Sequence, residues 1–90
     1  MKKPKVRRSI KKAVKIIGLI ELGRRLGITY QSISGWVDRD KIPDKEYCGK
    51  TLYSAAIEYH TDGEVTIEDI LGFVPEPQAI ELARLNRRKK

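Results

Sequence analysis

The segment from Leu19 to Val37 constrains the fold of this chain more than any other stretch, because it reads as two short helices joined by a tight turn. The first helix would bury one face at helical spacing, made by Leu19, Leu22, Gly23 and Leu26. Gly27 then ends this helix, since glycine adopts the left-handed backbone that closes a helix at little cost. The second helix would bury a stripe made by Ile33, Trp36 and Val37.

Residues in and beside the turn between these helices also indicate the type of motif. Gly23 is small at the place where two steeply crossing helices would touch, and Ile28 is a lone apolar residue that could fill the angle between them. Thr29 has a hydroxyl that can cap the following helix, whose polar residues would face outward. The pattern predicts a helix-turn-helix of the DNA-binding kind. The alternative is an ordinary helical hairpin in a small bundle.

The length and composition exclude several classes of protein. Ninety residues make one small domain, and no run approaches the roughly 18 apolar residues of a membrane span. The basic start leads into no apolar signal-peptide core. The single cysteine, Cys48, excludes an internal disulfide and suits a reducing cytoplasm, and it lies far in sequence from the single histidine, His60. We therefore expect no metal site and no cofactor.

The net charge of +7 is unevenly distributed along the chain. Residues 1–15 hold eight Lys or Arg and residues 84–90 hold five, with no acid in either segment. Residues 16–83 hold six basic residues against all twelve acidic ones, a net charge of −6. Basic ends around a domain with a neutral reading surface suit attraction to phosphate by the ends and choice of sequence by the domain. The alternative is that both ends are solubilising tails.

The positions of proline and glycine and the distribution of charge predict three segments. These are a basic flexible arm at 1–8, a helix-turn-helix domain at 9–74, and a basic tail or helix at 75–90. Within the domain we expect helices at 9–17 and 50–60 and a short turn at 44–48, with Ile42 as a buried anchor before it. A last short helix would begin at a capping box of Thr66 and Asp69 and end at Gly72. The fold class is thus all-α, a small helix-turn-helix domain of about five short helices.

The end of the domain is marked by a proline pair, Pro75 and Pro77. Phe73 and Val74 just before it are expected to pack back on the core. Beyond it, 78–88 has helical propensity with a weak apolar stripe, formed by Ala79, Ile80, Ala83 and Leu85. This tail helix could be a dimer contact, a DNA-contacting extension, or a helix formed with a partner.

Residues 27–37 resemble the recognition segment of the Cro/C1 class of phage repressors. Further along, 41–43, 56–58 and 61–70 are similar to small Cro-like and antitoxin-like regulators of prophages. The likeness covers about 19–72 and implies a lambda-repressor-like fold. Residues 44–51 are longer than the shared pattern, and the arm and the tail have no counterpart in it.

The resemblance implies which residues would contact DNA. The base readers would be Tyr30, Gln31 and Ser34, in the first turns of a helix lying in the major groove. Gln31 can bind adenine through two hydrogen bonds, or donate one to guanine. The expected contacts to the DNA backbone are Thr29, Ser32, Gly35, Arg24, Arg25, Arg39 and Lys41, together with Lys5, Arg7 and Arg8 of the arm. No Lys or Arg occurs between Leu26 and Arg39, so affinity per half-site should be modest.

The function expected from the resemblance is a sequence-specific transcriptional repressor of phage or prophage type. It would bind double-stranded operator DNA as a homodimer or higher homo-oligomer, in the cytoplasm of a bacterial or phage-infected host, at the nucleoid and not at a membrane. The alternative is an antitoxin or regulator controlled by a bound protein, such as a toxin or an antirepressor. An enzyme is not expected, because the sequence offers no Gly-rich phosphate loop and no activated nucleophile.

Overall fold

The structure is a computed structural model and describes residues 9–39 and 41–89. Its elements, in chain order, are α1 (Ser9–Ile17), α2 (Leu19–Leu26), α3 (Tyr30–Arg39), the short 3₁₀ helix η2 (Asp44–Glu46), α4 (Tyr53–His60), α5 (Ile67–Leu71) and α6 (Glu76–Lys89). Within the described residues the fold is all-helical without a strand, which confirms the predicted fold class. Residues 64 and 65, between α4 and α5, form a bend.

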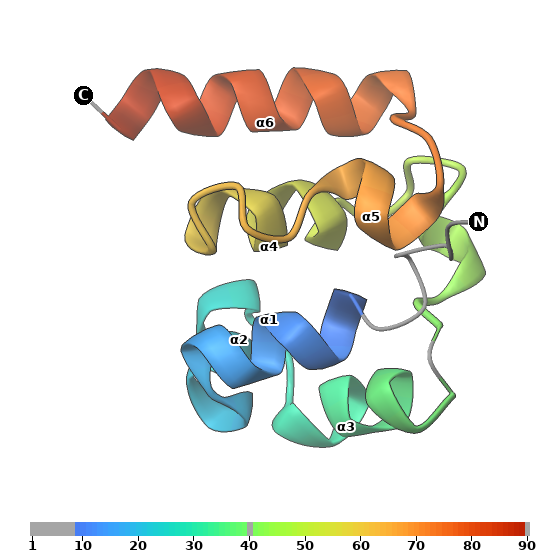
Figure 1. Cartoon of the computed structure of the whole chain (residues 1–90). Coiled ribbons are helices and arrows are strands. Elements are labelled where there is room, and N and C mark those ends of the chain that lie inside the picture. The colour runs from blue at the N-terminus through green and yellow to red at the C-terminus, as the bar shows by residue number, and fades with distance from the viewer. Residues whose placement is uncertain (1–8, 40, 90) are drawn as a thin grey trace, which may run out of the picture.

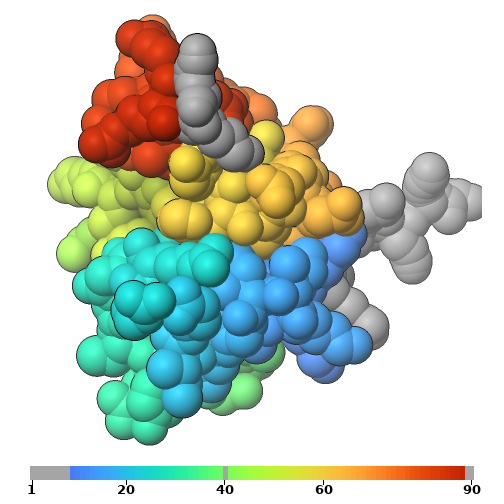
Figure 2. Space-filling model, turned by 90° about the vertical axis from the view of Figure 1, so that its left-hand side faces the viewer, coloured from blue at the N-terminus to red at the C-terminus, as the bar shows by residue number. Residues whose placement is uncertain are grey.

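The helices are arranged in layers between two ends of the molecule. Figure 1 shows α3 at one end and α6 at the other, with α1 and α2 beside α3 and with α4 and α5 between them and α6. The space-filling view in Figure 2 gives the same order from another side. In that order α4 contacts α5 and α6 and also touches α2. The middle layer therefore separates the helix-turn-helix from the C-terminal helix.

One hydrophobic core joins the helices α1 to α5. Its buried members are Ile10, Ala13, Leu22, Ile33, Trp36, Ile42, Ala55, Ile57, Val65, Ile67, Ile70 and Leu71. The expected anchors of the helix-turn-helix are among them, with Leu22 and Ile33 fully buried and Trp36 only 4% exposed. The ring centroids of Trp36 and Tyr53 lie 5.4 Å apart, and this contact connects α3 to α4. The prediction that Ile42 anchors the loop after α3 is confirmed, because its side chain is 2% exposed.

The predicted helix ends are also confirmed where glycine or threonine defines them. Gly27 closes α2 with φ +76°, and Gly72 closes α5 with φ +87°, both in the left-handed region that favours glycine. The Thr66 hydroxyl accepts from the backbone N–H of Asp69, and the Asp69 carboxylate accepts from the backbone N–H of Thr66. This is the capping box expected from the sequence.

Two local predictions are wrong. Phe73 and Val74 do not pack on the core, since each is 49% exposed. The left-handed turn at Gly72 directs the chain outward, and it is Pro75 that is buried on the way to α6. The helix expected at 50–60 begins only at Tyr53.

Helix α4 begins later than expected because of the carboxylate of Glu46, whose side chain is fully buried. It accepts hydrogen bonds from the Thr51 hydroxyl and from the Ser54 backbone N–H. A carboxylate that binds the first N–H groups of a helix acts as a cap and fixes where that helix begins. The residues just before Tyr53 are therefore held outside the helix.

The C-terminal helix docks through a buried polar residue, Gln78, and through the partly buried Leu82, which packs against the core. Gln78 is fully buried, and its side-chain oxygen accepts from the backbone N–H of Ala55 at 2.9 Å. Its side-chain nitrogen donates to a carboxylate oxygen of Glu46 at 2.8 Å and to the carbonyl oxygen of Thr51 at 3.0 Å. Three members of the apolar stripe expected on this helix face away from the core: Ala79 and Ala83 are exposed, and Ile80 is 60% exposed.

Candidate nucleic-acid interface

The angle between α2 and α3 depends on a glycine at their closest approach. A Cβ added at Gly23 would lie 2.9 Å from the carbonyl oxygen of Ile28 and 3.2 Å from the backbone nitrogen of Tyr30. The backbone N–H of Ile28 also donates to the carbonyl oxygen of Gly23 at 3.0 Å. The turn thus rests directly on α2, and the position of α3 follows from the absence of a side chain at Gly23.

The start of α3 is fixed by two hydroxyl groups. The Thr29 hydroxyl accepts from the backbone N–H of Ser32 at 3.3 Å, which is the cap expected from the sequence. The two side-chain oxygens of Thr29 and Ser32 lie 3.2 Å apart and share a hydrogen bond. Both residues are exposed, so the capped first turn of α3 stands at the surface of the molecule.

The side chains expected to read bases do not all have the same exposure. Tyr30 is 48% exposed and Gln31 is also exposed, both in the first turn of α3. Ser34 is half-buried, one turn further along. Ile33 and Trp36 fill the opposite side of the helix. The structure therefore offers an open face on α3, on which Tyr30 and Gln31 are more exposed than Ser34.

Gly35 gives room to a basic side chain from the end of the same helix. A Cβ built at Gly35 would meet the guanidinium of Arg39 at 3.4 Å, so Arg39 folds back along α3 over the glycine. Arg39 also lines a hollow of about 250 Å³ with Lys41, Ile42, Pro43 and Asp44. The ammonium of Lys41 lies 3.6 Å from the Asp44 carboxylate. Two exposed basic residues thus border one hollow just after α3.

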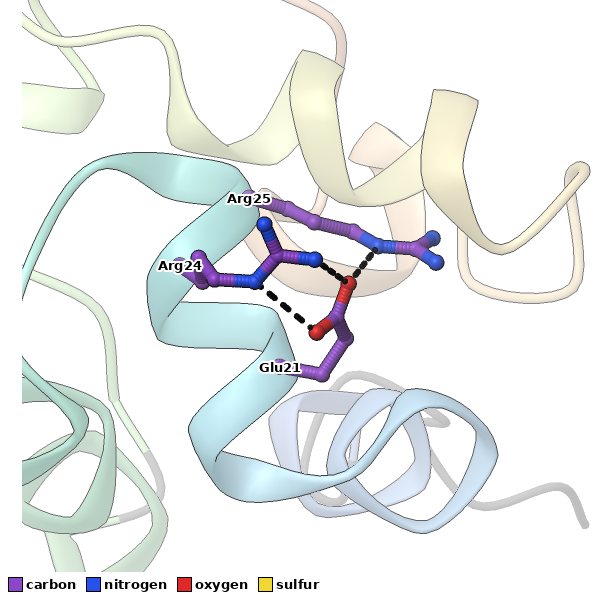
Figure 3. Close-up of polar contacts among 3 residues, drawn as sticks. All are labelled: Glu21, Arg24 and Arg25. Atoms are coloured by element: carbon purple, nitrogen blue, oxygen red, sulfur yellow. Dashed lines mark hydrogen bonds and ion pairs between the residues drawn. The ribbon is translucent and has the colours of Figure 1, made fainter.

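The two arginines of α2 share a single carboxylate, as Figure 3 shows. Arg24 donates two hydrogen bonds to Glu21, at 2.9 and 3.1 Å, and Arg25 donates one at 2.8 Å. The hydrogen bond from Arg25, together with the bond and charge of Arg24, lowers the pKa of the Glu21 carboxyl. Burial, and secondarily the charge of Arg25, lowers the pKa of His60 at the end of α4. Arg25 extends toward α4 (Figure 3) and is 41% exposed, whereas Arg24 is the more open of the two, with 74% of its side chain exposed.

The sequence prediction missed one residue of this site. Glu21 is the partner of both arginines, and its spacing of three and four positions before them was a sufficient signal. The expected phosphate contacts Lys5, Arg7 and Arg8 lie outside the described residues.

Two further features concern the part of the chain that the structure describes. None of its helices combines the length and the apolar character required to cross a membrane. No cluster of three or more His, Cys, Asp or Glu side chains within it could hold a metal ion.

Comparison with known proteins gives one result. The family model of the bacteriophage CI repressor helix-turn-helix domain matches residues 5–48, which include α1, α2, α3 and η2. Searches of curated proteins and of solved structures found no match. The match confirms the predicted resemblance to helix-turn-helix repressors of phages, and such domains belong to DNA-binding regulators. Residues 5–48, just under half of the chain, are therefore similar to the helix-turn-helix domain of bacteriophage CI repressors.

Proposed function

We propose that the chain is a sequence-specific transcriptional repressor of phage or prophage type that places α3 in the major groove of operator DNA. The observation that carries this proposal is the capped first turn of α3, where Tyr30 and Gln31 are exposed. A helix of this kind contacts base edges through its N-terminal residues. The close contact at Gly23 supports the proposal, because it fixes α3 against α2.

Each exposed group of this face has a role in the proposal. Gln31 binds a base edge through its amide, and Tyr30 supplies a hydroxyl and a ring edge near a thymine methyl. Ser34 is a third base contact, although its half-buried position limits its reach. Thr29, Ser32 and Gly35 lie close to the DNA backbone. These groups are neutral, so they choose the site without adding electrostatic attraction.

The attraction comes from basic groups around α3. Arg39 and Lys41 border the hollow after the helix and are placed to receive a phosphate. Arg24 is open to solvent, and Arg25 contributes less because its charge extends toward α4. Lys5, Arg7 and Arg8 of the arm add further phosphate contacts in the proposal. Two copies on a two-fold operator compensate for the modest affinity of one α3, and the repressor acts in the cytoplasm.

The proposal is tested by selecting bound sequences from a random DNA pool and then measuring affinity for the selected site. Gln31→Ala and Tyr30→Ala should each weaken binding to that site by roughly tenfold to a hundredfold, the usual discrimination of a good base contact. Their binding to random DNA should stay unchanged and salt-sensitive. Asn86→Ala, an exposed polar residue on α6, is the matched control. Equal losses on selected and random DNA would refute base reading by α3.

A second candidate function is control by a protein partner, such as a toxin or an antirepressor. The observation in its favour is the exposed pair of Tyr47 and Phe73, whose rings stack with centroids 6.2 Å apart, next to the exposed Val74. Phe73→Ser should then leave operator affinity intact while abolishing regulation by the partner in the host cell. A variant that regulates normally would remove this candidate.

A further inference from the structure

The outer face of α6 carries a stripe that the rest of the molecule leaves unused. Gln78 and Leu82 mark the inner face, which packs toward the rest of the molecule. With 3.6 residues per turn, the line on the opposite side of the helix is set by residues 76, 80, 83 and 87. All four side chains are exposed. In order they are an acid, a large apolar group, a small residue and a base: Glu76, Ile80, Ala83 and Arg87.

We propose that this stripe binds the same stripe of a second copy of the chain, with the two α6 helices antiparallel. In that arrangement Glu76 of each copy faces Arg87 of the other, and Ile80 of each copy faces Ala83 of the other. The surface is self-complementary in charge and in size, as a two-fold interface between identical subunits requires. Parallel helices would instead set Glu76 against Glu76 and Arg87 against Arg87.

Neighbouring residues support the pairing of two helices over binding to another surface. Ala79 and Ala83 are small and exposed, which allows two helix backbones to approach closely. Arg84 is bound to Glu81 at 2.9 Å and is therefore already paired within its own helix. An acid at one end of the stripe and an isoleucine with 60% exposure near its centre disfavour a polyanion as its occupant.

The predicted association is weak. One pair of short helices buries much less than the roughly 1,200 Å² at which standard protein interfaces begin. Ile80 is the only large apolar side chain of the stripe, so most of the selectivity comes from the two charge pairs. We therefore expect a monomer–dimer equilibrium in the range of tens to hundreds of micromolar, where concentration by DNA would favour pairing.

The place of α6 in the fold decides what such a pair would do. Because α3 and α6 lie at opposite ends of the molecule (Figure 1), pairing through α6 leaves the two α3 helices on the far sides of the pair. If α3 binds DNA as in the proposed function, on which this step rests, each α3 would then bind its own DNA segment. The α6 contact would join two separate operators and would be distinct from any contact between copies on adjacent half-sites.

The pairing is tested first without DNA, by sedimentation equilibrium of the full chain over micromolar to millimolar concentrations. Glu76→Arg and Arg87→Glu should each weaken self-association by roughly tenfold or more, because two facing charge pairs become repulsive. An equimolar mixture of these two variants should associate like the wild type, since both charge pairs are restored in the heterodimer. The chain carrying both substitutions should also self-associate. Arg88→Glu, an equal charge change beside the stripe, is the control and should have little effect.

A wild-type chain that stays monomeric at millimolar concentration would overturn the pairing, and so would an Arg88→Glu effect as large as that of Arg87→Glu. Ile80→Asp should abolish association without unfolding the chain, as circular dichroism would show, because Ile80 lies outside the core.

DNA then provides a separate readout, in which an immobilised operator captures a second, labelled operator. The wild type should capture it, and Ile80→Asp should bind single operators normally without capturing a second. Pairing in solution without any operator binding would refute the proposed function and leave the α6 contact standing. Operator binding without capture by the wild type would refute the joining of two operators.

Discussion

Replacing Gly23 by alanine tests whether the contact between α2 and the turn sets the position of α3. Alanine in a helix interior is favoured over glycine by about 1 kcal/mol, so local propensity alone predicts a more stable protein. The new Cβ would lie 2.9 Å from the carbonyl oxygen of Ile28, closer than real Cβ contacts allow. Relief requires the turn to move by roughly half an ångström, since ordinary contact begins near 3.4 Å.

Overpacking of this kind costs about 1–3 kcal/mol, and here the neighbours are backbone atoms that cannot rotate away. Subtracting the propensity gain of about 1 kcal/mol, we expect Gly23→Ala to lower the free energy of unfolding by up to about 2 kcal/mol net, a sizeable part of the roughly 5–15 kcal/mol typical of native proteins. Because the same shift moves α3, affinity for the selected operator should fall as well.

Urea denaturation measures the first effect and DNA titration the second. For the denaturation experiment Gly35→Ala is the matched control, because it gains the same helix propensity and its Cβ meets only the flexible end of Arg39, at 3.4 Å. The control should raise the free energy of unfolding by about 0.5–1 kcal/mol. If Gly23→Ala were stabilising to the same degree, the close contact could not be what positions α3.

Three other predictions follow from single contacts. Because the pKa of His60 is lowered in the folded state, the unfolded chain binds more protons, and the free energy of unfolding falls as the pH drops below about 6.5. His60→Gln should make this fall smaller in urea denaturation measured between about pH 5 and 7. An unchanged dependence on pH would contradict this prediction. Thr66→Ala removes the cap of α5 and should cost about 1 kcal/mol in urea denaturation, whereas Thr66→Ser should cost little. Gln78→Ala removes a hydrogen-bond donor from the buried Glu46 carboxylate and should lower the free energy of unfolding by about 2–4 kcal/mol, with faster amide hydrogen exchange in α6. Slow exchange in the variant would show that α6 docks without this side chain.

The sequence allowed the helix-turn-helix to be predicted because each of its constraints is local. Gly27 ends α2, Thr29 caps α3, and the apolar spacing of Ile33 and Trp36 assigns the buried face within one or two turns of helix. The capping box of α5 belongs to the same class, with partners three positions apart. Such signals are complete within a short window of sequence.

The docking of α6 could not be predicted in this way, because it depends on a buried polar residue. Gln78 is bonded to Thr51 and Glu46, which precede it by 27 and 32 positions, and apolar periodicity gives no weight to a glutamine. Periodicity therefore favoured Ile80, which lies on the outside. In the candidate site, the spacing of Arg24 and Arg25 likewise could not separate the open arginine from the one that extends toward α4.

The carboxylate of Glu21 has a consequence for the electrostatics of DNA binding. Since Arg24 and Arg25 are both bonded to it, the three side chains together carry one positive charge instead of two. The steepness with which DNA affinity falls with salt reflects the number of counterions displaced from the phosphates. Under the proposed function, α2 would displace counterions as a single cation, and Glu21 would serve as an internal counterion that makes repressor binding less sensitive to the ionic strength of the cell.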